Sequence, residues 1–118
     1  MLDDDQFKTL LVLGFLFRKL GLDDKASRLY QTLLALRPDD PSLLAPAAAA
    51  ALAEGRGEDS LDLLERLEAS GSQNFQPVHW LIRAKAYAAL ERPEEAHKAA
   101  LKYIEGLPNE GDKSQGDK

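Results

Sequence analysis

The sequence predicts an all-α protein made of three tandem helix-turn-helix units, and three observations support this. First, residue types recur with a period of about 34 positions, so that large, small and turn residues fall in register. Second, Ala and Leu, which favour helices, are abundant, whereas the β-branched residues are only two Val, two Ile and two Thr. Third, Gly and Pro interrupt the chain at intervals that suit short helices. A fixed period of this length is typical of stacked helical arrays.

The recurrence is carried by matching residues in three copies of the unit. The first copy contains Leu10, Leu13, Gly14, Phe17, Gly21, Ala26, Tyr30, Leu33 and Pro38. The second copy contains Leu44, Ala47, Ala48, Ala51, Gly55, Ser60, Leu64 and Leu67. The third copy follows a two-residue insertion and contains Trp80, Ala84, Tyr87, Ala96, Ala100, Tyr103 and Pro108. Small residues are expected where the two helices of a unit cross closely, namely Gly14, Ala48 and Ala84 on the first helix and Ala26, Ser60 and Ala96 on the second.

Start and stop signals predict six helices. The acidic residues from Asp3 to Asp5 would cap the first helix and complement its dipole, and Gly21 would end it. The expected helices run from this cap to Leu20, from Asp23 or Asp24 to Leu36, from Leu43 to Glu54, from Asp59 or Ser60 to Ala69, from Pro77 to Leu90, and from Pro93 to the residue before Gly106. Pro46 conflicts with the third of these, so that helix either begins at Ala45-Pro46 or is bent.

Composition limits the class of protein. A chain of 118 residues is long enough for one domain with a core, and its formal net charge of −5 argues against nucleic acid as a partner. The absence of Cys excludes disulfides and thiolate metal sites. The acidic start is unlike a signal peptide, and the apolar run from Leu10 to Phe17 is far shorter than the roughly 20 residues that span a bilayer. We therefore expect a cytoplasmic protein that does not insert into a membrane.

At these positions the chain resembles tetratricopeptide repeat (TPR) proteins. The clearest match is the segment from Ala26 to Asp40, ASRLYQTLLALRPDD. The resemblance implies a single domain over residues 1–108, a short right-handed solenoid with repeats at about 7–40, 41–72 and 77–108, and it leaves 109–118 as a polar tail that we expect to be disordered. The chain departs from the family pattern at Ser60, where Ala is usual, at Ser72, where Pro is expected, and at Arg83, where Leu is usual.

The layout also resembles the small TPR chaperones of bacterial type III secretion, most of all the YscY family. The segments that carry this resemblance are Leu13-Gly14-Phe15-Leu16, Leu34-Ala35-Leu36-Arg37-Pro38, Trp80-Leu81 and Tyr103. The resemblance implies a cytoplasmic chaperone that shields a small, helical export-apparatus protein of the YscX type. Needle-subunit and translocator chaperones use the same repeats and stay open as alternatives. A general adaptor in another bacterial complex, or a purely structural self-assembling module, is the further alternative.

The register of the repeats predicts where a partner would bind. In an array of this kind the first helix of each repeat lines the concave face. Apolar and small side chains there would form a groove for an amphipathic helix or an apolar segment. The predicted partner-binding residues are Leu11, Phe15, Ala45, Ala49, Leu52, Leu81 and Lys85. For Leu11 and Ala49, packing in the core is an equal alternative.

The remaining residues indicate neither catalysis nor a cofactor or metal. His79 and His97 fall on different expected helices, without a second ligand at metal spacing. The last expected helix keeps an apolar side with Ala99, Ala100, Tyr103 and Ile104, and the first is apolar nearly all round. We therefore expect the isolated protein to be marginally stable, to self-associate, for example as a homodimer when the client is absent, or to need its partner.

Overall fold

The computed structural model describes residues 2–107, and in these residues it confirms an all-α protein without β-strands. The helices form three hairpins, α1–α2, α3–α4 and α5–α6. Their bounds are α1 Asp4–Lys19, α2 Asp23–Leu36, α3 Pro41–Ala53, α4 Gly57–Ala69, the 3₁₀ helix η1 Ser72–Asn74, α5 Pro77–Ala89 and α6 Pro93–Glu105. The predicted disordered tail at 109–118 lies outside the described residues.

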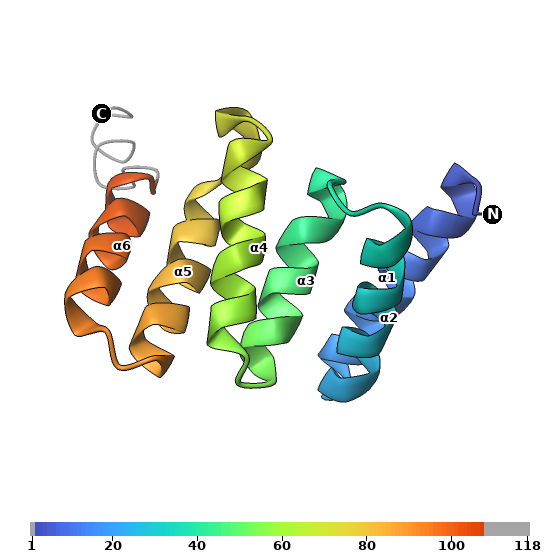
Figure 1. Ribbon diagram of the computed structural model, residues 1–118, viewed down its shortest axis with the longest axis horizontal. Coiled ribbons are helices and arrows are strands. Elements are labelled where there is room, and N and C mark those ends of the chain that lie inside the picture. Colours follow the sequence, from blue (N-terminus) through green and yellow to red (C-terminus); the bar gives the residue numbers. More distant parts are fainter. Residues whose placement is uncertain (1, 108–118) are drawn as a thin grey trace, which may run out of the picture.

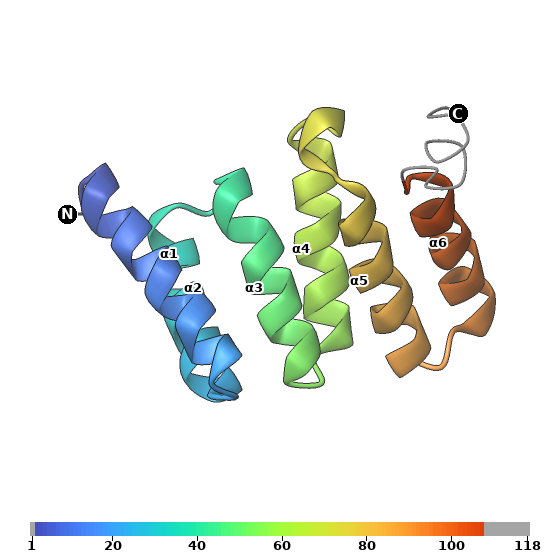
Figure 2. The same cartoon turned by 180° about the vertical axis from the view of Figure 1, so that it is seen from behind.

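The hairpins lie side by side along the longest dimension of the molecule (Figure 1). The two helices of each hairpin pack against each other, and α2 packs on α3 and α4 on α5. The first helices of successive hairpins also touch, since α1 contacts α3 and α3 contacts α5. The view from behind shows these first helices in succession (Figure 2). The polypeptide therefore stacks its hairpins in chain order.

One turn recurs inside every hairpin. Gly21 and Gly55 both have a φ of 78°, and Glu91 at the equivalent place in the third hairpin has a φ of 59°. The residue after each donates its backbone N–H to the carbonyl five positions back, at 2.8 Å for Leu22 and Arg56 and 2.9 Å for Arg92. This is a Schellman-type helix end, which favours Gly at the left-handed position. The repeat seen in the sequence is thus a repeat of backbone conformation, which Glu91 adopts without the glycine.

The same turn corrects the expected caps of the second helices. Asp23 and Asp24 do not cap α2, because Leu22 is both the last residue of the turn and the N-cap. The two acids lie in the first turn instead, where they face the positive end of the helix dipole. In the second hairpin α4 already begins at Gly57, ahead of the predicted Asp59 or Ser60, for the same reason.

The third helix begins earlier than predicted. Asp40 caps α3 by accepting the backbone N–H of Ser42 at 3.0 Å, and Pro41 occupies the first turn. Pro46 therefore lies inside the helix, and the alternative start at Ala45-Pro46 is wrong. The other predicted ends agree to within one residue, and Asp3 caps α1 as expected, with Gln6 completing a capping box.

The core lies mainly in the first two hairpins. Its largest fully buried side chains include Tyr30, Leu33, Leu43, Leu44, Leu64 and Leu67. The predicted small residues at the crossings are buried in these hairpins, and an added Cβ on Gly14 would come within 2.7 Å of the Tyr30 ring. Ser60, which stands where the other hairpins have Ala26 and Ala96, donates its hydroxyl to the Ala48 carbonyl at 2.9 Å, so its buried oxygen has a hydrogen-bond partner. In the third hairpin Ala84 is buried but Ala96 is only half-buried.

Candidate protein-binding surface

The structure places the predicted partner-binding residues on three helices that touch. Leu11 and Phe15 lie on α1, Ala45, Ala49 and Leu52 on α3, and Leu81 and Lys85 on α5. They occupy equivalent positions in the three hairpins, so that Leu11, Ala45 and Leu81 form one row and Phe15, Ala49 and Lys85 the next. We call these seven residues the inner surface.

The members of the inner surface differ in exposure. Phe15 is 53% exposed, and the Lys19 ammonium lies 5.3 Å from the centre of its ring. Leu11 and Ala45 are half-buried and pack against the core, so they form the floor of the surface rather than its contact points. Ala49, Leu52 and Leu81 are half-buried, and Lys85 is exposed. The surface thus combines one projecting aromatic ring with a wall of small side chains.

Arg18 lies next to this surface with an unsatisfied polar atom. It is equivalent in position to Leu52, one turn beyond Phe15 on α1. Its Nε is buried and has no hydrogen-bond partner within residues 2–107. The nearby Tyr30 hydroxyl has its pKa raised by burial, with Arg18 acting in the opposite direction. A buried guanidinium nitrogen without a partner is costly, so Arg18 lowers the stability of this end of α1.

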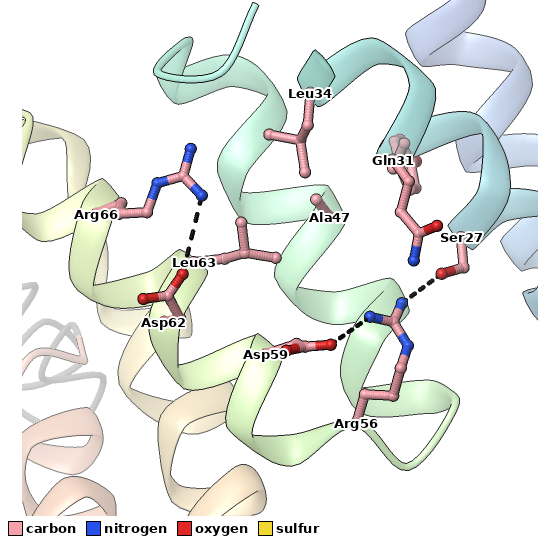
Figure 3. A pocket seen from close by; sticks show the side chains of 10 residues that line it. Ser27, Gln31, Leu34, Ala47, Arg56, Asp59, Asp62, Leu63 and Arg66 are labelled. Atoms are coloured by element: carbon pink, nitrogen blue, oxygen red, sulfur yellow. Dashed lines mark hydrogen bonds and ion pairs between the residues drawn. The ribbon is translucent and has the colours of Figure 1, made fainter.

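A second hollow lies between α2 and α4, on the second helices rather than the first (Figure 3). Arg56 reaches across it and donates to the Ser27 hydroxyl while its Nη1 pairs with Asp59 at 2.8 Å. Arg66 pairs with Asp62 at 3.9 Å and donates to the Pro38 carbonyl. Because these charged groups already have partners, we interpret the hollow as an ionic joint between the first two hairpins. Sequence reasoning missed it, although Arg56 stands where the first hairpin has Leu22.

The equivalent joint between the second and third hairpins explains the unusual Arg83. Its guanidinium lies 4.6 Å from the centre of the Phe75 ring and 4.7 Å from that of Trp80. It also pairs with Glu68 of α4 at 3.0 Å. Phe75 belongs to the insertion that separates the second and third copies. The positive charge at this position, where the first two hairpins have Leu13 and Ala47, is therefore matched by a local set of partners.

The two histidines lie in separate environments. His79 is buried at the start of α5, where its Nδ1 accepts the backbone N–H of Gln76 at 2.9 Å. Burial lowers the pKa of His79, which keeps the ring neutral and able to accept this bond. His97 is exposed on α6. Over residues 2–107, no group of three or more His, Asp or Glu side chains could hold a metal ion.

A third feature is an open cleft at the end of the array, between α5 and α6. It encloses about 730 Å³ and is lined mainly by small apolar side chains, including Ala84, Ala88, Ala96 and Ala100. Beside it, Leu101 and Ile104 of α6 are exposed. Of the apolar side predicted for the last helix, Ala100 lines the cleft and Ile104 is exposed, whereas Ala99 is buried and Tyr103 is half-buried.

Comparison of the chain with protein-family models and with curated proteins gave no match. Among the described helices, none is both long and apolar enough to cross a lipid bilayer. The resemblances to TPR proteins and to type III secretion chaperones are therefore carried by the residues quoted above, and they enter the proposal below as predictions.

Proposed function

We propose that this protein is a TPR-type binding module that holds an apolar helix or segment of another protein against its inner surface. The observation that carries the proposal is Phe15, a large aromatic side chain that is 53% exposed beside half-buried Ala49 and Leu52. Alanines allow a partner backbone to approach closely, while an aromatic ring supplies apolar area. This combination is typical of helix-in-groove recognition.

The magnitude of the contact is modest for each side chain. Covering the exposed half of Phe15 would contribute about 1 kcal/mol, and a similar amount is available from Leu52 and Leu81 together. Micromolar affinity requires roughly 8 kcal/mol, so a partner must cover several turns along all three first helices.

The specific form of the proposal is a type III secretion chaperone of the YscY kind, with a small YscX-type export protein as its client. It rests on the resemblance of the sequence segments given above. The mechanism would be mass action, because a client whose apolar face is occupied cannot self-assemble until it is handed over. Needle-subunit and translocator proteins are the alternative clients, and a permanent adaptor would differ by not releasing its partner.

The test is a titration of the purified protein with a fluorescently labelled YscX-type protein, in parallel with a needle subunit and a translocator segment. Phe15→Asp and Leu81→Asp should weaken binding at least about tenfold, since each places a charge at the centre of the apolar contact. Leu36→Asp is the matched control, because Leu36 is 57% exposed on α2, away from the inner surface. Circular dichroism would show that all three variants keep their helices.

Equal loss of binding in all three variants, or no loss in either inner-surface variant, would contradict the proposed surface. Binding of a needle subunit in place of the YscX-type protein would keep the chaperone role and change the client. Absence of binding by every one of these proteins would leave no support for the secretion role.

A further inference from the structure

We propose that the protein also binds a second copy of itself head to tail, with α1 of one copy seated in the cleft between α5 and α6 of the next. The two surfaces lie at opposite ends of the array (Figure 1) and exclude the residues of the inner surface apart from Lys85, which borders the cleft. The inference does not depend on the proposed client. It depends on how this chain already packs one hairpin on another.

The two joints inside the chain show which residues of one hairpin lie against the hairpin before it. In the joint between the second and third hairpins, Gly57 at the start of α4 lies under Leu90 and next to the carbonyl of Ala86, since an added Cβ would be 3.1 Å from Leu90 Cγ and 3.4 Å from Ala86 O. In the joint between the first two hairpins, Ala47 lies beside Ser27 and Tyr30. Each first helix thus presents one defined face to the hairpin before it.

On α1 the same face has nothing before it within residues 2–107. The residues equivalent to Ala47, Ala86 and Leu90 are Leu13, Leu16 and Leu20. Leu16 is 48% exposed and Leu20 is 71% exposed. Among residues 2–107, the first helix therefore carries the docking face of α3 and α5 with apolar side chains that no hairpin covers.

The cleft between α5 and α6, at the other end of the array, provides the complementary surface. Tyr30 and Leu64 are buried, whereas the equivalent Ala100 lines the open cleft. Ala26 and Ser60 are likewise fully buried, and the equivalent Ala96 is open to the same cleft. In the first joint the large Tyr30 lines the same hollow as the small Ala47, whereas the equivalent residues at the two ends are the small Ala100 and the large Leu13. At this pair of positions the sizes are exchanged between the two surfaces, so that they stay complementary.

The two ends also differ from the internal joints in polarity, because apolar side chains stand at the ends where the joints have polar ones. The internal joints are polar along one edge, where Gln31 and Arg56 line the same hollow in the first and Glu68 binds Arg83 in the second. The residues equivalent to Gln31 and Glu68 in the last hairpin are Leu101 and Ile104. On α1 the residue equivalent to Arg83 is Leu13. All three are exposed apolar side chains, and they would meet if α1 occupied the cleft.

A second copy fits these surfaces better than the rest of this chain does. Residues 108–118, PNEGDKSQGDK, contain no large apolar side chain that could fill an apolar cleft. Because the two surfaces differ, each copy keeps one of them free after binding, and association is open-ended rather than closed.

Sedimentation velocity over a wide concentration range tests this with two variants of the full chain, Leu16→Asp on α1 and Ile104→Asp on α6. Both side chains are exposed in one copy, so the fold is expected to survive each change. The unmodified protein should grow steadily in mass with concentration, and each variant alone should remain monomeric. An equimolar mixture should form a dimer of one copy of each, because the intact cleft of one variant accepts the intact α1 of the other. Leu36→Asp should behave like the unmodified protein.

Two results would overturn the inference. A monomer at all concentrations, for the unmodified protein, would show that the ends do not bind each other. A closed dimer that is lost in Leu16→Asp but kept in Ile104→Asp would show that α1 pairs with α1. Neither result would bear on the client-binding titration, which is read at Phe15 and Leu81.

Discussion

Glu91 is the residue at which the fold most clearly departs from its own pattern. It holds the left-handed conformation, with a φ of 59°, at the place where the other two hairpins have Gly21 and Gly55. A side chain in this region costs a non-glycine residue about 1–2 kcal/mol. Glycine there would remove that cost but would add about 0.5–1 kcal/mol of unfolded-state entropy. Glu91→Gly should therefore stabilise the protein by about 0.5–1 kcal/mol.

The assay is urea denaturation followed by circular dichroism, together with the melting temperature, which should rise by about 2–4 °C. Glu91→Ala is the matched control, because it removes the charge but keeps the Cβ and should not stabilise. The converse changes Gly21→Ala and Gly55→Ala should each destabilise by about 1 kcal/mol. A Cβ added at either glycine meets no atom within 4 Å, so packing does not enter the comparison. The reasoning is refuted if Glu91→Gly and Glu91→Ala have the same stability.

Three further predictions concern the packing of the hairpins. Gly14→Ala should lower the free energy of unfolding, measured by urea denaturation, by about 1–3 kcal/mol, because the new Cβ would lie 2.7 Å from the Tyr30 ring. Ala35→Gly on the exposed side of α2 is the comparison that changes helix propensity alone. Arg83→Leu, which introduces the residue found at the equivalent Leu13, should lower stability by about 1–2 kcal/mol through loss of the ring and Glu68 contacts. Unchanged stability would contradict the role of these contacts. The pKa of His79 is lowered by burial from 6.5, so its contribution to stability should be complete above pH 6.5 and lost as the pH falls through its folded-state pKa. His79→Gln should flatten the dependence of stability on pH in this range. An unaltered dependence would show that other groups cause it.

The fold class and most helix bounds could be predicted because they depend on local signals. Gly21, Gly55, Pro77 and Pro93 mark turns or first turns by backbone geometry that few residues share. The caps of the second helices could not be predicted, because an acid near a helix start is compatible with both the cap and the first turn. The Schellman-type turn, whose last residue is Leu22 or Arg56, decided that these two residues take the cap position.

The repeat register predicted which residues occupy equivalent positions on the first helices, but it did not predict how deeply each side chain is buried. Helical spacing places Leu11 and Phe15 on one face of α1, yet only packing against the second hairpin shows that Leu11 supports the floor while Phe15 projects. The joints at Arg56 and Arg83 were missed because their partners lie on neighbouring hairpins, more than ten positions away. The sequence signal that could have found them is a charge at a position that is apolar in the preceding copy.

The most direct test of binding at the inner surface is an NMR comparison of backbone amide signals with and without the YscX-type protein. We expect the largest shifts on α1, α3 and α5, centred on Phe15, Ala49 and Leu81. Shifts concentrated on the second helices, around Arg56 and Arg66, would contradict a partner site on the inner surface.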